Sequence, residues 1–139
     1  MKNSKTGVLF VCIGNMCRSP MAEGFAREFG GDSIQSWSAG THPSGVVSEE
    51  SIRMMEEINI DIAHQRSQGL DTIPFDEIDI VVSMAMRPAR NLVPPDFTGR
   101  TLDWEVPDPL GGSTDYYRSV RDDIGARVRD LLDELETTK

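Results

Sequence analysis

The sequence predicts an α/β fold: a single domain with a parallel sheet of about four strands and helices on both faces. Two observations predict this class. Short apolar runs alternate four times with amphipathic segments, a pattern typical of repeated strand–helix units with right-handed crossovers. The chain has 139 residues, of which 38% are hydrophobic and 27% are charged, and these values fit one globular domain rather than a disordered chain. We therefore expect one domain over residues 1–139.

The first strand and the first helix are predicted between residues 8 and 30. Val8 to Cys12 is a continuous apolar run, as in a strand that is buried on both faces. After a break rich in turn residues, Ser19 and Pro20 indicate a helix start, because serine caps helices and proline fits their first position. An apolar stripe from Met21 to Phe29 continues this helix until a glycine pair ends it.

The next elements repeat this alternation. Ile34 to Ala39 is typical of a second strand, and from Ser48 apolar residues at helical spacing predict a second amphipathic helix. Residues 78–84 are a third strand candidate, a short helix could span Pro88 to Leu92, and Thr101 to Val106 could form a fourth strand. Five apolar residues that recur in steps of three and four predict the last helix: Val120, Ile124, Val128, Leu131 and Leu135.

Composition and charge exclude several classes of protein. No stretch approaches the roughly 18 apolar residues that a membrane span needs, and the first apolar run is too short for a secretory signal. The net charge of −9 would repel nucleic acid. The only cysteines, Cys12 and Cys17, favour a reduced, cytoplasmic setting over a disulfide-stapled secreted fold. We expect no nucleic-acid or membrane partner, no metal and no cofactor.

The segment between the first strand and the first helix is the main candidate site. Its backbone N–H groups can turn inward as a nest, and the helix N-terminus adds about half a positive charge, so a tetrahedral dianion could bind there. Arg18 adds a planar fork that matches two oxygens. The same field favours the thiolate of Cys12, which would make this residue a nucleophile. The spacing alone also fits a buried Cys12 and a surface Arg18.

Three further residues are candidates for supporting roles. A cysteine that attacks such an anion needs an acid for the leaving oxygen, and Asp108, held between two prolines after the expected fourth strand, could supply it. Asp108 could instead only initiate a turn. Cys17 could be a packed small residue or a reversible disulfide partner of Cys12. His64, taken alone, is typical of a loop histidine.

Three segments resemble the low-molecular-weight protein tyrosine phosphatases and the arsenate reductases that share their fold. They are the loop within residues 8–23, the strand exit at residues 38–41, and the acid loop at Asp108-Pro109. The resemblance implies that Cys12 attacks phosphorus to form a phosphocysteine and that Arg18 clamps the oxygens. It also implies that Asp108 protonates the leaving group and later activates water.

The resemblance further implies roles for residues around the nucleophile. Ser19 is similar to the hydroxyl that stabilises the thiolate, and Asn15, Ser38 and His64 are similar to the residues that hold the family's loop in shape. We expect the substrate to contact the loop itself, which consists of Ile13, Gly14, Asn15, Met16, Cys17, Arg18 and Ser19.

The main functional hypothesis is a phosphomonoester phosphatase of protein-tyrosine type, with a phosphorylated protein or a small aryl phosphate as substrate. The alternative is an arsenate reductase that uses a small external thiol of glutathione or mycothiol type, because Asp103-Trp104 resembles the arsenate reductases. The thioredoxin-coupled reductases carry two further cysteines where this chain has Ser83 to Asn91, so an internal disulfide relay to that segment is excluded. A third hypothesis is a phosphate-binding or redox-sensing module without turnover.

Overall fold

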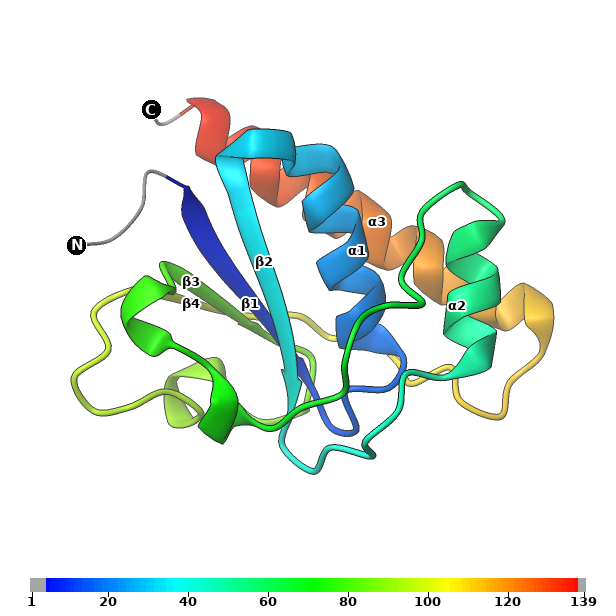
Figure 1. Cartoon of the computed structure of the whole chain (residues 1–139), viewed down its shortest axis with the longest axis horizontal. Helices are drawn as coiled ribbons and strands as arrows, with labels where there is room; N and C mark the ends of the chain where they lie inside the picture. Colours follow the sequence, from blue (N-terminus) through cyan, green and yellow to red (C-terminus); the bar gives the residue numbers. More distant parts are fainter. Residues whose placement is uncertain (1–4, 138–139) are drawn as a thin grey trace.

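Within residues 5–137, which the computed structural model describes, a four-stranded parallel sheet forms the centre of the molecule (Figure 1). The strands are β1 (Thr6–Cys12), β2 (Ile34–Gly40), β3 (Ile80–Ser83) and β4 (Arg100–Asp103). Their spatial order is β2-β1-β3-β4. Because β1 is parallel to both of its neighbours, its carboxyl end lies at the same edge of the sheet as theirs.

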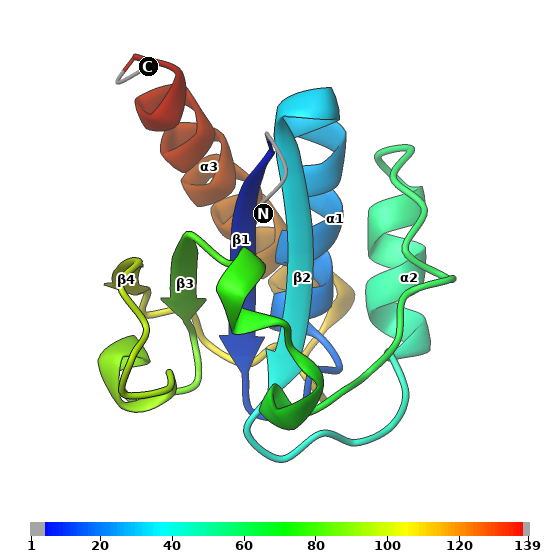
Figure 2. The same ribbon diagram turned by 60° about the vertical axis from the view of Figure 1, so that its left-hand side comes forward.

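The α-helices of the described chain pack on one face of this sheet (Figure 2). They are α1 (Arg18–Gly30), α2 (Glu49–Glu56) and α3 (Thr114–Thr137), and a 3-10 turn, η1 (Gly31–Ser33), links α1 to β2. α1 lies against β1 and β2 and packs along α3, while α2 packs on both helices. None of these helices is both long and apolar enough to cross a membrane.

Single helical turns cover the other face of the sheet. They are η2 (Leu70–Thr72), η3 (Phe75–Glu77) and η4 (Ala89–Asn91), and they enclose a smaller core around Leu9, Val11 and Val81. Prolines at positions 74, 88, 94 and 95 interrupt these connections, and proline lacks the N–H group that a longer helix needs. The predicted fold class is confirmed, with long helices on one face and short turns on the other.

The start of α1 differs from the sequence-based expectation. α1 begins at Arg18, so Ser19 is its second residue and not its cap, and Cys17 occupies the cap position. The reason is that the Ser19 hydroxyl lies against the Cys12 sulfur and accepts a hydrogen bond from Asn15. Ser48, in contrast, caps α2, because its hydroxyl accepts a hydrogen bond from the Ser51 N–H at 3.0 Å.

The other elements lie close to their predicted positions. β3 and β4 have four residues each and are shorter than expected. Ile78, Asp79 and Met84 lie outside β3, and residues 104–106 continue past the sheet toward the acid loop. The predicted short helix after β3 is the single turn η4. In α3, Val120, Ile124, Val128 and Leu131 are buried and Leu135 is partly buried, as the spacing predicts.

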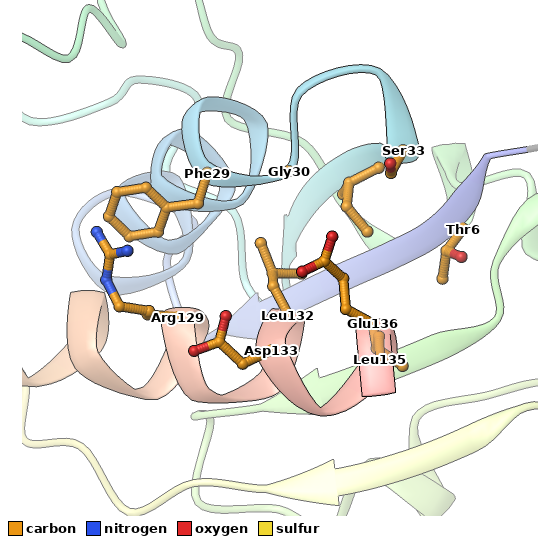
Figure 3. A pocket seen from close by; sticks show the side chains of 10 residues that line it. Thr6, Phe29, Gly30, Ser33, Arg129, Leu132, Asp133, Leu135 and Glu136 are labelled. Carbon is orange, nitrogen blue, oxygen red and sulfur yellow. The ribbon is translucent and has the colours of Figure 1, made fainter. Parts of the chain in front are cut away.

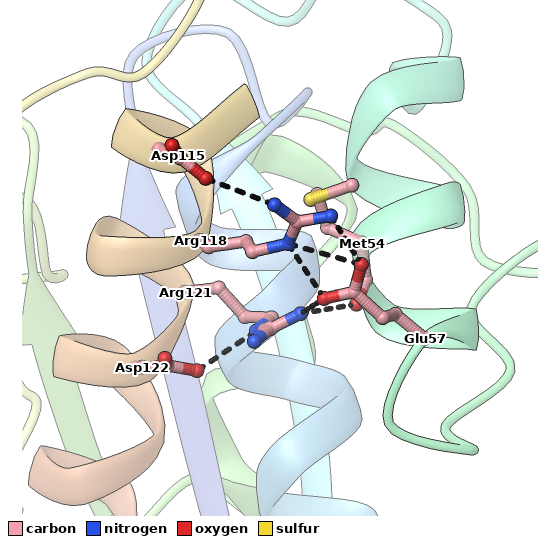
Figure 4. A network of polar contacts seen from close by, with 6 residues as sticks. All are labelled: Met54, Glu57, Asp115, Arg118, Arg121 and Asp122. Atoms are coloured by element: carbon pink, nitrogen blue, oxygen red, sulfur yellow. Dashed lines mark hydrogen bonds and ion pairs between the residues drawn. The ribbon is translucent and has the colours of Figure 1, made fainter. Parts of the chain in front are cut away.

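Two arginines of α3 fix α2 in place (Figure 4). The buried Arg121 donates to the Met54 carbonyl at 2.9 Å and to Glu57 Oε1 at 2.6 Å. Arg118 donates to Glu57 Oε2 at 2.7 Å. These hydrogen bonds lower the pKa of Glu57 to about 2. The network holds α2, and with it the loop that precedes α2, against α3.

Candidate active site

The loop between β1 and α1 turns its carbonyl groups outward. The carbonyls of Cys12, Ile13, Gly14 and Met16 accept hydrogen bonds of 2.8, 2.9 or 3.1 Å from N–H groups of residues 41–48. Within the described chain, the N–H groups of residues 13–18 donate to no protein acceptor. Unpaired N–H groups at a helix N-terminus form a binding site for an anion. The loop can therefore hold a tetrahedral oxyanion.

Two backbone positions allow the loop to curve in this way. Asn15 has a φ of 47°, in the left-handed region that asparagine tolerates better than most residues. Gly40, at the end of β2, lies so close that a Cβ atom there would come within 2.7 Å of the Ile13 carbonyl oxygen. A side chain at residue 40 would push the loop away from β2.

Cys12 lies at the base of the loop with its sulfur beside a hydroxyl. The Cys12 Sγ is 3.0 Å from Ser19 Oγ, and Asn15 Nδ2 donates to the same oxygen at 2.8 Å. Because Ser19 Oγ already accepts from Asn15, its own hydrogen can point to the sulfur and stabilise a thiolate. The N-terminus of α1 adds a positive potential at the same point. Cys12 is therefore placed to act as a nucleophile.

Arg18 is held by two backbone carbonyls in the segments that follow β3 and β4. Its Nη1 donates to the carbonyl of Met84 at 2.7 Å and to that of Val106 at 3.0 Å. Its Nε is buried and has no hydrogen-bond partner in the described chain. A buried guanidinium N–H without a partner is costly unless a ligand accepts its hydrogen bond. The remaining donors of Arg18 therefore suit an oxyanion bound in the loop.

Asp108 forms part of a turn and also lies near Arg18. Its Oδ1 accepts a hydrogen bond from the Leu110 N–H at 3.1 Å, so it does shape a turn. Its Oδ2 lies 4.0 Å from Arg18 Nη2, and its side chain is 51% exposed. Asp108 also lines a hollow of about 200 Å³ together with Cys12, Ile13, Gly14, Met16, Cys17, Arg18 and Leu110. The structure thus brings a thiol, a guanidinium and a carboxyl group to one opening.

Asn15 and Ser19, which we expected to contact the substrate, are fully buried and their side chains do not line the hollow. The reason is that both side chains face the protein interior, where Asn15 Nδ2 donates to Ser19 and to Ser38 Oγ at 2.9 Å. Ser38 in turn donates to Glu23 Oε1 at 2.6 Å. Their side chains support the loop from behind.

His64 does not take the position expected from the resemblance. It is exposed, and within the described chain no hydrogen bond joins its ring to the loop. Gln68 and Ser67 lie there instead, because this segment turns its backbone toward Asn15. The Gln68 N–H donates to Asn15 Oδ1 at 2.7 Å, and Ser67 Oγ donates to the Gly14 carbonyl at 3.2 Å. No sequence pattern singled out either residue.

Cys17 is buried behind the loop and belongs to a second polar cluster. Its Sγ donates to Ser48 Oγ at 3.6 Å, and Tyr117 Oη lies 2.9 Å from Ser48 Oγ and 2.7 Å from Ser51 Oγ. Burial, and then the contact with Cys17, raise the pKa of Tyr117. Both cysteines are free thiols. A reversible disulfide between Cys12 and Cys17 stays a prediction.

A hollow at the opposite end of the sheet has different chemistry (Figure 3). Its volume is about 100 Å³, and it lies between the start of β1 and the ends of α1 and α3. Arg129 stacks over the ring of Phe29, with its guanidinium carbon 4.1 Å from the ring centre. The other charged groups are the carboxylates of Asp133 and Glu136, and no cysteine lines it. This end of the molecule does not suit an oxyanion.

Comparisons with known proteins agree on the family and on the fold. Residues 7–139 match the family model described as low molecular weight phosphotyrosine protein phosphatase. A glutaredoxin arsenate reductase of Synechocystis sp. is 38% identical over 127 residues, which cover 90% of this chain and 95% of the relative. An arsenate reductase of Bacillus cereus (strain Q1) is 37% identical over 134 residues, covering 93% and 95%.

Solved structures with a similar fold include arsenate reductases and an arginine phosphatase. An arsenate reductase in the phosphate binding state is 37% identical with a TM-score of 0.83, covering 93% of this chain and 98% of the other. An arginine phosphatase from Geobacillus stearothermophilus has a TM-score of 0.83 at 27% identity, covering 96% and 94%.

The sequence-based hypothesis of a protein-tyrosine-type phosphatase is wrong as the main functional assignment. Relatives with 34 to 38% identity are arsenate reductases, whereas the phosphatases among the similar structures have 25 to 27% identity. Phosphate and arsenate are tetrahedral oxyanions of similar shape and charge, so one loop can present the same groups to either. The spacing from Cys12 to Arg18 therefore does not distinguish the two reactions. The findings favour the alternative hypothesis.

Proposed function

Because the chain belongs to the low molecular weight phosphotyrosine protein phosphatase family, we propose that it is an arsenate reductase whose reductant is a small external thiol. The observation that carries the proposal is the position of the Cys12 sulfur beneath unpaired N–H groups, in a chain whose relatives at 34 to 38% identity are arsenate reductases. In this proposal, residues 1–139 act as one domain.

In the first step, the Cys12 thiolate attacks arsenic and one arsenate oxygen leaves. The loop N–H groups and Arg18 hold the other oxygens as charge builds on them. Asp108, beside Arg18 at the mouth of the hollow, donates a proton so that the oxygen leaves as water. A sulfur–arsenic bond forms and an arsenic–oxygen bond breaks, while arsenic stays in the +5 state.

In the second step, an external thiolate attacks the Cys12 sulfur. The sulfur–arsenic bond breaks and its electron pair stays on arsenic, which leaves as arsenite in the +3 state. Cys12 is then part of a mixed disulfide with the external thiol. A second thiol molecule attacks this disulfide, restores the Cys12 thiolate and leaves as the oxidised dimer. Two thiols are oxidised for each arsenate that is reduced.

Two features support a small molecule as the thiol. The sequence contains only Cys12 and Cys17, and the Cys17 sulfur lies against Ser48. Cys12 is only 2% exposed, at the base of a hollow of about 200 Å³. A thiol on the surface of a folded protein would have to enter this hollow, whereas a small thiol fits into it. Both features support a small molecule as the reductant that meets the Cys12–arsenic adduct.

A single assay tests the proposal. Purified protein with arsenate and either glutathione or 2-mercaptoethanol should form arsenite, with two thiols consumed for each arsenite. Cys12→Ser should form none and should still bind phosphate, because the loop N–H groups and Arg18 remain in place. If the unmodified protein forms no arsenite with any small thiol, the proposed function is rejected.

A further inference from the structure

We propose that a second hollow, next to the anion loop, binds the thiol substrate and selects a thiol whose far end carries both a carboxylate and an ammonium group. A γ-glutamyl peptide thiol such as glutathione has this chemistry. The inference rests on the proposed reductase function and adds a substrate class to it.

The second hollow lies at the same edge of the sheet as Cys12. It has a volume of about 300 Å³, and its walls include Met84, Met86, Arg87, Trp104, Glu105 and Val106. Two of these residues, Met84 and Val106, also supply the carbonyls that hold Arg18. Arg18 in turn lines the hollow above Cys12. The two hollows are therefore neighbours on either side of the Arg18 clamp.

The strand register gives the separation between the two hollows. Val11 pairs with Ser83, and Ser83 pairs with Asp103, so Cys12, Met84 and Trp104 follow one another across the edge of the sheet. Neighbouring strands are about 4.8 Å apart, which places the backbone of Trp104 about 10 Å from the backbone of Cys12. An extended peptide spans about 3.3 Å per residue. A tripeptide-sized thiol could therefore place its sulfur at Cys12 and its far end near Trp104.

The charged groups at this far end are free to bind a ligand. Within residues 5–137, the Arg87 guanidinium and the Glu105 carboxylate have no hydrogen-bond or ion-pair partner, and both residues are exposed. The third charged residue, Asp103, accepts the Ala89 N–H at its Oδ1 at 2.7 Å and keeps its negative charge, which adds to the attraction of Glu105 for an ammonium group. One free cation and one free anion complement an amino-acid end, with the guanidinium fork suited to its carboxylate.

The remaining walls suit the middle of such a molecule. Met84, Trp104 and Val106 are apolar, and Met86 is 91% exposed at the rim of the hollow with a φ of 61°. Exposed apolar side chains around a few polar groups are typical of a small-molecule site. A thiol without charged ends, such as 2-mercaptoethanol, would reach Cys12 but make none of the contacts with Arg87 or Glu105.

A comparison of two thiols tests this site. The readout is the ratio of the KM for glutathione to the KM for 2-mercaptoethanol, at saturating arsenate. Arg87→Ala should raise this ratio about tenfold, which corresponds to a loss of about 1.4 kcal/mol of binding free energy. Glu105→Gln should raise it as well. Arg90→Ala removes an exposed arginine that does not line the hollow, so its ratio should equal that of the unmodified protein.

Direct binding separates this inference from the proposed function. S-methylglutathione cannot reduce arsenic, and its binding can be followed by NMR titration or calorimetry without any turnover. It should bind the unmodified protein and bind Arg87→Ala about tenfold more weakly. Equal binding to both proteins, no binding to either, or an unchanged KM ratio in Arg87→Ala would overturn the site. A failure to form arsenite would instead overturn the reductase proposal.

Discussion

Among single side chains, Ser19 has the most direct influence on the nucleophile. Both N–H bonds of the Asn15 amide are used, one toward Ser19 and one toward Ser38, while its oxygen accepts from Gln68. Ser19 Oγ is therefore an acceptor for Asn15, and its own hydrogen is within reach of the Cys12 sulfur at 3.0 Å and of the Ala39 carbonyl at 3.5 Å. The sulfur is the nearer of the two acceptors, and a negative charge on Cys12 would attract this hydrogen.

Replacing Ser19 should make Cys12 less reactive. A hydrogen bond to a charged group contributes about 1.5–3 kcal/mol, so Ser19→Ala should slow alkylation of Cys12 by iodoacetamide at pH 7 by roughly tenfold or more. The rate can be followed by mass spectrometry of the peptide that contains Cys12. Ser36→Ala is a matched control, because its hydroxyl donates to the Glu23 carbonyl and not to the loop. Equal rates in the two variants would remove Ser19 from this role.

The positions of some site residues could be predicted from sequence, and others could not. Cys12 ends β1, Arg18 opens α1 and Asp108 follows β4. Because the strands are parallel, these positions lie at the same edge of the sheet. Gln68 and Glu23 act through hydrogen bonds between segments far apart in the chain. The role of Glu23 depends on how α1 packs on β2, and that of Gln68 on how the 61–69 segment lies against the loop. The path of this segment also explains why His64 is exposed instead.

The helix α1 and the strand β2 are joined through a partly buried carboxyl group. Glu23 on α1 accepts a hydrogen bond from Ser38 on β2 at 2.6 Å. Burial raises the pKa of Glu23 from 4.5 to about 7, although the Ser38 hydrogen bond and the nearby Arg27 both act to lower it. The folded protein therefore holds a proton on Glu23 at a pH where the unfolded chain has lost it.

This shift predicts how stability changes with pH. Because the pKa is raised in the folded state, the contribution of Glu23 is fully present below pH 4.5 and is lost as the pH rises to about 7. A shift of this size corresponds to on the order of 3 kcal/mol. Glu23→Gln cannot ionise, so its free energy of unfolding relative to the unmodified protein should rise between pH 4.5 and pH 7. Urea unfolding of both proteins at several pH values measures this difference in the free energy of unfolding. A difference that stays constant from pH 4.5 to pH 7 would contradict the prediction.

Helices and strands could be predicted where the pattern of apolar residues within the element itself is clear. Apolar periodicity is sufficient for α3, and a continuous apolar run is sufficient for β1. The start of α1 was misplaced because Ser19 uses its hydroxyl for Cys12 instead of for the helix backbone. The turns η2 and η3 were not predicted, because three residues are too few to show a periodic pattern. The equally short η4 was predicted as a longer helix, from Pro88 to Leu92.

The molecule as a whole is acidic, yet the hollow proposed to bind the anion has one cationic and one anionic side chain together with unpaired loop N–H groups. The net charge is −9, but Arg18 and Asp108 are the only charged residues that line the hollow above Cys12 within the described chain. Charges farther away than about 8 Å are largely screened at physiological salt. The loop N–H groups and Arg18 therefore decide the affinity for a small oxyanion, while the overall charge acts against large polyanions.

Binding of an oxyanion should stabilise the whole fold, because the loop connects β1, α1 and the segment before α2. A ligand at about 100 times its dissociation constant adds about 2.7 kcal/mol to the free energy of unfolding. For a domain of this size that corresponds to a rise in Tm of roughly 10 °C, measurable by calorimetry with phosphate or arsenate.

The choice of variants separates this effect from nonspecific salt. Cys12→Ser should keep the rise in Tm, because the loop N–H groups and Arg18 remain. Arg18→Lys should lose most of it, since lysine has no planar fork and no Nε donor for the anion. Arg18→Lys also loses the hydrogen bonds to Met84 and Val106, which lowers its Tm without anion. The quantity to compare between variants is therefore the change in Tm when anion is added. An equal shift in Arg18→Lys, or an equal shift with chloride, would mean that the anion binds elsewhere.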